Sequence, residues 1–239
     1  MKLRPFHWWR TVFFLIPAVG LYTVVLGIVS LASTLIDRSG HFAHKCARTW
    51  ARWILWTTGV KVERSGPLPP LESSAVIVSN HASIYDIPIL FTALPLQLRI
   101  PAKASLGSFP FIGWHLRLAG HLLIERKNPG PGIIKRMKKM VQQNASLIIF
   151  PEGSRSPDGL VTKFKGGSFL LAIDNQLPIV PITIVNSPNV MRKGELMVQP
   201  ATVQVILHDP IPTAGLTRTD ARALAQQVED VVAKDARKV

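Results

Sequence analysis

A histidine and an aspartate that could together activate a hydroxyl group stand five positions apart. The apolar run 75–78, typical of a buried strand, leads directly into Ser79-Asn80-His81-Ala82-Ser83-Ile84-Tyr85-Asp86. In a regular helix His81 and Asp86 would lie about 140° apart, but a strand-to-helix turn can bring them together. A neutral imidazole then takes the hydroxyl proton while a carboxylate stabilises the imidazolium. Taken alone, the pair is more typical of a turn histidine followed by a helix-capping aspartate.

Two arginines suited to phosphate follow further apolar runs. The run 147–150 leads into Phe150-Pro151-Glu152-Gly153-Ser154-Arg155-Ser156, where proline and glycine predict a fixed turn. The segment Gly120-His121-Leu122-Leu123-Ile124-Glu125-Arg126 ends a shorter apolar run on a second arginine. A planar guanidinium binds phosphate through paired hydrogen bonds. Taken alone, the first segment also fits a solvated Glu/Arg pair on a loop, and Arg126 also fits a surface cation.

The elements that must position these groups alternate along the chain after Lys61. Apolar runs predict strands at 75–78, 98–102, 122–124, 147–150, 179–185 and 202–207, with prolines interrupting the second and the fifth. Amphipathic stretches predict helices at 84–93, 111–119, 131–143, 167–175 and 218–236. This alternation predicts an α/β fold with helices on the faces of a sheet. Three of the motif segments stand at strand ends, where open α/β sheets place their sites.

Residues 1–60 are predicted to form a membrane anchor, and residues 61–239 the catalytic body beyond it. The segment 11–36 contains no charged residue, and as a helix it would reach about 39 Å, too long for a secretory signal. Basic residues flank it on both sides, so a kink or hairpin at Pro17-Gly20 would let both flanks meet the cytoplasmic leaflet. The stretch 41–58 is expected as a second helix, interfacial rather than core-packed, with Trp50, Trp53 and Trp56 at the headgroup boundary.

Composition limits the possible classes of protein. The chain of 239 residues carries a formal net charge of +14, yet 47% of its residues are hydrophobic. A disordered basic tail is therefore excluded, and attachment to an anionic membrane is favoured. The single cysteine, Cys46, excludes an internal disulfide and a zinc site built from several cysteines. A hydrolase would need a G-x-S-x-G nucleophile elbow, which the sequence lacks.

In combination, these segments resemble the glycerolipid acyltransferase family, most closely the bacterial 1-acyl-sn-glycerol-3-phosphate acyltransferases. The resemblance covers residues 61–207 and rests on Asn80-His81-x-Ser83-x-x-Asp86, the blocks 120–126 and 150–156, and Val180-Pro181-Ile182. Ser154 stands where threonine is common, and Leu123 replaces the usual Phe/Ile types. The resemblance implies an α/β fold with a mixed, mostly parallel sheet flanked by helices, following an N-terminal membrane-anchoring segment.

The same resemblance implies the chemistry of acyl transfer. An acyl group would pass from a thioester to the sn-2 hydroxyl of lysophosphatidate, giving phosphatidate. His81 would be the general base, oriented by Asp86, with no acyl-enzyme intermediate and therefore no nucleophilic role for Ser83. Neither a metal nor a cofactor is implied, because acyl-CoA or acyl carrier protein serves as the donor substrate.

The resemblance also implies a site for the substrate phosphate. Lys103, Arg126 and Arg155 would hold the phosphate group. Glu152 and Gly153 would shape the pocket, with Glu152 positioning Arg155. The basic stretch 133–141 would bind anionic lipid or the acidic part of an acyl donor, and a solvated helix face explains it equally well.

The expected partners are membrane phospholipid, lysophosphatidate, and acyl-CoA or acyl carrier protein, with no nucleic acid. The expected location is the inner, cytoplasmic membrane, with the active site at its cytoplasmic face. Within enzymes, acylation of glycerol 3-phosphate or of another lysophospholipid stays open, because the motif blocks do not separate these acceptors. From another class, a basic membrane-bound nucleic-acid or scaffold protein also fits the charge.

Overall fold

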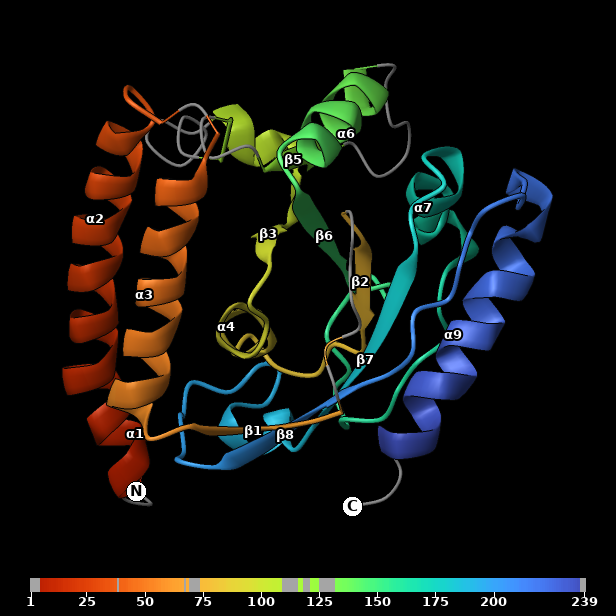
Figure 1. Ribbon diagram of the computed structural model, residues 1–239. Helices are drawn as coiled ribbons and strands as arrows, with labels where there is room; N and C mark the ends of the chain where they lie inside the picture. Colours follow the sequence, from red (N-terminus) through yellow and green to blue (C-terminus); the bar gives the residue numbers. More distant parts are fainter. Residues whose placement is uncertain are drawn as a thin grey trace.

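One sheet of six strands forms the centre of the molecule in the computed structural model (Figure 1), which describes residues 5–37, 39–66, 68, 74–108, 116–117, 121–124 and 132–236. Its order is β1-β8-β7-β2-β6-β3, and every neighbouring pair of these strands is parallel except β7–β8. The strands are β1 (Lys61–Ser65), β2 (Val76–Ser79), β3 (Gln97–Arg99), β6 (Ala145–Ile149), β7 (Ile179–Val185) and β8 (Thr202–Leu207). The predicted α/β class with a mixed, mostly parallel sheet is confirmed.

Two strands differ from the sequence prediction. The strand β1 was not predicted, because four of its five side chains are exposed and the segment is rich in charge, as befits the edge of a sheet. The run 98–102 is not one strand but the ends of two. β3 stops at Arg99, and β4 (Pro101–Lys103) pairs in a separate two-stranded sheet with β5 (Leu122–Ile124). Pro101, which has no N–H, begins β4 at the point where the chain changes sheets.

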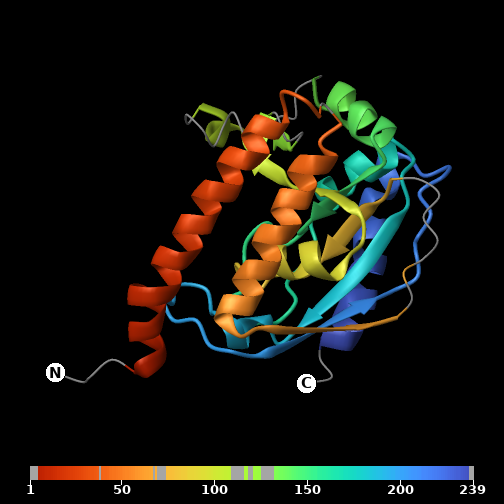
Figure 2. The same ribbon diagram turned by 60° about the vertical axis from the view of Figure 1, so that its left-hand side comes forward.

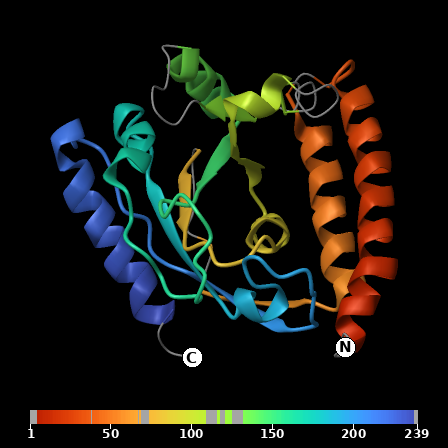
Figure 3. The same cartoon turned by 180° about the vertical axis from the view of Figure 1, so that it is seen from behind.

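Helices cover both faces of the central sheet, and each face has its own apolar core (Figures 1 and 3). On one face pack α3 (His41–Thr58) and α4 (Asp86–Ala93), and on the other α6 (Gly132–Gln142), α7 (Leu170–Asp174) and α9 (Ala221–Ala236). In β2, Ile77 belongs to the first core while Val76 and Val78 belong to the second. This two-sided burial explains why β2 reads as a continuous apolar run.

Shorter helical turns complete the connections between these elements. They are η2 (Ala104–Ser108), η3 (Gly166–Ser168), α8 (Ser187–Val190) and η4 (Arg218–Asp220). The helices predicted at 167–175 and 218–236 therefore begin with 3-10 turns, η3 and η4. Most of the helix predicted at 111–119 lies outside the described residues.

The N-terminal segment forms one continuous helical rod through α1 (Phe6–Arg10), the π-helical turn η1 (Thr11–Leu15) and α2 (Ile16–Ser33). By length and composition this rod, Phe6–Ser33, is able to cross a membrane, and only 6% of its most apolar window is buried. The hairpin predicted at Pro17-Gly20 is not formed. The wider turn of η1 ends two residues before Pro17, and the helix continues past this residue, which cannot donate an N–H. The chain reverses later, between the end of α2 and the start of α3, so that these two helices lie side by side (Figure 2).

Helix α3 is both a core helix and an exposed one. Its residues Ala51, Ile54 and Leu55 are buried in the first core, which excludes a purely interfacial helix. On the other side, Trp53 is 44% exposed and Trp56 is 79% exposed. One side of α3 packs in the core of the body and the other side is exposed. This helix therefore connects the predicted anchor to the body.

Candidate active site

The turn between β2 and α4 brings His81 and Asp86 together. Strand β2 ends at Ser79, and Asp86 is the first residue of α4. The imidazole Nδ1 of His81 lies 2.7 Å from Oδ2 of Asp86. The same oxygen accepts the backbone N–H groups of Ala82 at 2.8 Å and Ser83 at 2.9 Å. Asp86 is therefore at once the partner of His81 and the residue that fixes the turn. The backbone groups that it accepts precede α4, so it orders the turn rather than capping the helix.

The imidazole of His81 is partly exposed, with 17% of its side chain accessible, whereas the side chain of Asp86 is fully buried. The ring stacks on Phe150 with centroids 4.1 Å apart and an interplanar angle of 19°. Because a carboxylate only accepts, Nδ1 carries the hydrogen of this pair. The opposite nitrogen, Nε2, then keeps its lone pair, as a general base requires.

Hydrogen bonds with the backbone of neighbouring segments hold the His81 turn in place. The amide of Asn80 both donates to and accepts from the backbone of Ile184 in β7, each at 2.8 Å. The backbone N–H of Ser156 donates to the carbonyl of His81 at 2.7 Å. The hydroxyl of Ser83, fully buried, donates to the carbonyl of Met191 at 2.8 Å. Asn80 was quoted in the motif but given no role, and the structure places it as the tie between β2 and β7.

The carboxylate of Glu152 supports His81 rather than Arg155. Its Oε1 accepts the backbone N–H of His81 at 2.8 Å, and its Oε2 accepts the N–H and hydroxyl of Thr162 at 3.2 and 2.6 Å. Among the described ion pairs none joins Glu152 to Arg155. Burial raises the pKa of the Glu152 carboxyl above its ordinary value, and the hydrogen bonds from Thr162 and His81 oppose that shift. Glu152 thus links the His81 turn to the segment that contains Thr162.

The turn that carries Arg155 is shaped by glycine and by two lysines. Gly153 has φ +78°, a conformation that favours glycine, and an added Cβ would lie 2.7 Å from Nζ of Lys165. The side chain of Arg155 is half-buried, and its carbonyl accepts a hydrogen bond from Nζ of Lys193 at 2.8 Å. Lys165 and Lys193 were not predicted as site residues, because neither belongs to a motif block.

The other predicted phosphate ligands are described only in part. The backbone of Lys103 lies in β4, which pairs with β5. In the sequence, β5 ends two residues before Arg126, the other predicted phosphate ligand. The side chain of Lys103 and all of Arg126 lie outside the described residues. Within the described ranges, no three His, Cys, Asp or Glu side chains gather as a metal site would require.

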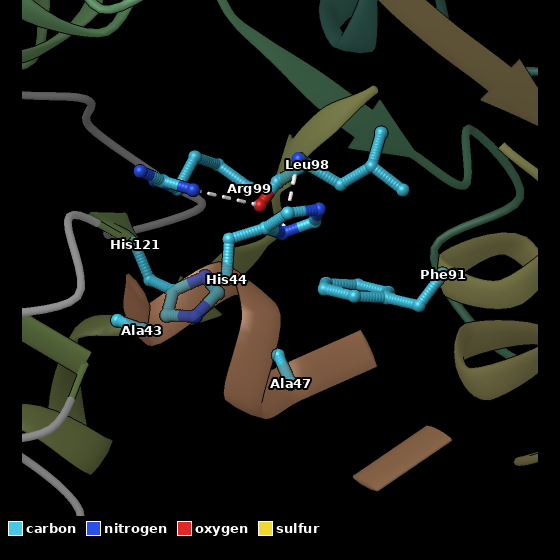
Figure 4. Close-up of a pocket in the computed structure, with 7 residues that line it drawn as sticks. All are labelled: Ala43, His44, Ala47, Phe91, Leu98, Arg99 and His121. Atoms are coloured by element: carbon cyan, nitrogen blue, oxygen red, sulfur yellow. Dashed lines mark hydrogen bonds between the residues drawn. The ribbon is translucent and has the colours of Figure 1, made fainter. Parts of the chain in front are cut away.

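A small cavity lies elsewhere, between α3 and β3, and contains none of the predicted site residues (Figure 4). Its volume of about 10 Å³ is enough for about one water molecule. His44, Arg99 and His121 line it together with apolar side chains. Burial, with the nearby charge of Arg99, lowers the pKa of His44 to about 4. His44 is therefore neutral near pH 7, and the cavity is too small for a lipid substrate.

Comparisons with known proteins find similar sequences. The model of the family described as Acyltransferase matches residues 59–185. A chloroplastic 1-acyl-sn-glycerol-3-phosphate acyltransferase of Brassica napus is 30% identical over 207 residues, which is 80% of this chain and 60% of that protein. The 1-acyl-sn-glycerol-3-phosphate acyltransferase alpha of Homo sapiens is 34% identical over 192 residues, covering 77% and 66%. The chain thus spans about two thirds of the length of these relatives, or less.

A solved structure shares the fold. The crystal structure of the 1-acyl-sn-glycerophosphate (LPA) acyltransferase PlsC from Thermotoga maritima aligns with a TM-score of 0.75 at 23% identity, over 92% of this chain and 94% of that one. The family model spans more than half of the 239 residues and includes both the His81 turn and the Arg155 turn. The chain therefore belongs to the acyltransferase family.

Proposed function

We propose that this protein transfers a fatty acyl group from a thioester to the sn-2 hydroxyl of 1-acyl-sn-glycerol 3-phosphate, giving phosphatidate. The observation that carries the proposal is the 2.7 Å contact between Nδ1 of His81 and Asp86, with the other ring nitrogen left for a proton. The similar 1-acyl-sn-glycerol-3-phosphate acyltransferases, which are 30% and 34% identical, support the choice of acceptor. Acyl-CoA and acyl carrier protein are the two donors that fit this chemistry.

The transfer needs one base and an activated acyl group. Nε2 of His81 takes the proton of the sn-2 hydroxyl while the hydroxyl oxygen forms a bond to the thioester carbonyl carbon. The C–S bond then breaks, and the imidazolium returns the proton to the leaving thiolate. Asp86 stabilises the imidazolium between these two events.

No covalent acyl-enzyme is needed on this route. The hydroxyl of Ser83 is fully buried and already donates to the carbonyl of Met191. Cys46 is buried within α3.

The backbone N–H groups of residues 81–83 donate to Glu152 and Asp86, so they do not form the oxyanion hole that the tetrahedral intermediate requires.

We assign the substrate phosphate to the cations around the Arg155 turn. Arg155 is half-buried and forms no ion pair with a described carboxylate, so its guanidinium keeps its donors for phosphate. Lys103 and Arg126 are proposed as further ligands on the evidence of the motifs. Gly153 permits the turn, and Glu152 is proposed as a positioning residue for His81.

The membrane surface is proposed as the place of reaction. The outward side of α2 is apolar, with Leu21, Val24 and Ile28 each at least 60% exposed. Such a surface binds lipid rather than water. We place the protein on the cytoplasmic face of the inner membrane, held by the α2–α3 pair, with the active site at the height of the headgroups.

The direct test is an assay of the purified full chain with two acceptors, lysophosphatidate and glycerol 3-phosphate, each with acyl-CoA and with acyl carrier protein. The proposal predicts phosphatidate from lysophosphatidate with at least one donor, and little product from glycerol 3-phosphate. Preference for glycerol 3-phosphate would assign the first acylation step instead. A salt-sensitive shift of nucleic acid without transfer to either acceptor would favour a binding protein.

A further inference from the structure

We propose that Lys165, outside every motif block, is a second cation that holds the substrate phosphate beside Arg155. This inference rests on the proposed function and names one further ligand of that site. It starts from position: the segment 162–165 is bound to the catalytic turns by three hydrogen bonds. Thr162 donates two of them to Oε2 of Glu152, and the backbone N–H of Lys165 donates the third to the carbonyl of Pro151 at 3.2 Å.

The side chain of Lys165 lies against the Arg155 turn. Its Nζ lies 2.7 Å from the point that a Cβ on Gly153 would occupy, so the ammonium group sits directly against that glycine. Gly153 is two residues from Arg155 and next to Glu152, which holds the backbone of His81. The ammonium group of Lys165 therefore contacts the same turn that carries Arg155, the predicted phosphate ligand.

In the described part of the chain, no carboxylate forms an ion pair with the cations at this turn. The carboxylate of Glu152 is occupied by His81 and Thr162, and Asp158 accepts hydrogen bonds from Ser156 and Leu160. Within the described part of the chain, neither Arg155 nor Lys165 forms an ion pair. Lys193 adds a third cation, with its Nζ on the carbonyl of Arg155. Three cationic side chains on or against one turn, none of them in a described ion pair, offer positive charge to a dianionic group such as a phosphate monoester.

A purely structural role makes a different prediction. If Lys165 only packs its aliphatic stem on Gly153, the uncharged side chain of methionine replaces it without loss. If the charge holds phosphate, Lys165→Met loses affinity and Lys165→Arg keeps part of it. Lys163 is the matched control, because it is an exposed lysine two residues earlier in the same segment.

The test is isothermal titration of the full chain with hexanoyl-lysophosphatidate, without acyl donor, so that no turnover occurs. Lys165→Met is expected to weaken binding about 10- to 100-fold, the effect of losing one charge-assisted hydrogen bond, and Arg155→Ala at least as much. Lys163→Met is expected to bind within twofold of the unaltered protein. Monohexanoylglycerol, which lacks phosphate, is expected to bind equally to all four proteins.

Unchanged affinity of Lys165→Met for lysophosphatidate would overturn the assignment, as would an equal loss of affinity for monohexanoylglycerol. Circular dichroism and the melting temperature verify that each variant is folded, and Lys165→Arg provides a second, conservative variant. The proposed function is tested separately by the transferase assay. A protein that transfers no acyl group to lysophosphatidate would end that proposal, while the titration would still decide whether Lys165 binds the phosphate.

Discussion

Asp86 combines two tasks in one oxygen atom. Its Oδ2 accepts hydrogen bonds from the ring of His81 and from the backbone of Ala82 and Ser83. The two backbone donors demand an acceptor at that point, so they fix the orientation of the carboxyl group independently of its charge. The orientation of the imidazole and the stabilisation of its charged form are therefore separable by mutation.

Asp86→Asn tests this separation. The backbone N–H groups of Ala82 and Ser83 are expected to keep the amide oxygen at the Oδ2 position, so the ring of His81 keeps its tautomer. The negative charge is lost while the hydrogen bond to the ring is kept, and kcat is expected to fall about 10- to 100-fold with KM for the acceptor little changed. Steady-state kinetics measure both constants. A fall as large as that of His81→Ala would show that the tautomer is lost as well.

At the scale of elements, the motif turns depend on the ends of β2 and β6. Their apolar runs were predictable from sequence because both faces of each strand are buried. The turn residue Gly153 was predictable as a turn, but its contact with Lys165 was not, since twelve positions of chain separate them and only the fold brings them together.

Gly153→Ala is expected to act in two ways. The φ of +78° costs a non-glycine residue about 1–2 kcal/mol, and the new Cβ displaces Nζ of Lys165. We expect a lower melting temperature and a higher KM for lysophosphatidate. In a Lys165→Ala background the loss of stability is expected to persist, while KM rises no further.

Gly167→Ala serves as the control for this prediction. An added Cβ there meets no atom within 4 Å, and its φ is not in the left-handed region. It is expected to leave stability and KM close to those of the unaltered protein. Additive KM effects of Gly153→Ala and Lys165→Ala would contradict the contact between the two positions.

The limits of sequence prediction follow from the same elements. The helix at 41–58 was predicted to its exact bounds, since its apolar spacing is regular and Gly59 ends it in the left-handed conformation. The edge strand β1 was missed because its exposed, charge-rich side chains carry no apolar signal. The role assigned to Glu152 differed because a carboxylate three positions from an arginine in sequence need not pair with it. In the folded chain its partners come from His81 and Thr162.

At the scale of the whole molecule, the N-terminal rod is part of the folded unit rather than a free tether. Thr11 accepts the backbone N–H of Val198 at 3.0 Å, and Arg10 donates to the carbonyl of the same residue at 3.1 Å. Farther along, Tyr22 hydrogen-bonds Thr57 of α3. If the α2–α3 pair crossed the bilayer, it would carry the exposed Lys45 and Arg52 toward hydrocarbon. The arrangement favours binding to one leaflet.

Cysteine labelling of sealed inverted vesicles tests this prediction. Phe6→Cys and Ile36→Cys, each in a Cys46→Ala background, place probes at exposed positions toward opposite ends of the rod, 74% and 92% exposed. Binding to one leaflet predicts that a membrane-impermeant reagent reaches both positions only from the cytoplasmic side. Labelling of the two positions from opposite sides would establish a span.

The most direct measurement of the central claim is kcat for His81→Ala and for Ser83→Ala, with lysophosphatidate and the better thioester donor. A general base at His81 and direct transfer without an acyl-enzyme predict that His81→Ala lowers kcat by about 10²–10⁴-fold or more. They also predict that Ser83→Ala, which loses only a hydrogen bond to Met191, stays within about tenfold of the unaltered rate. A folded His81→Ala protein with a nearly full rate, or a folded Ser83→Ala protein with none, would contradict the account.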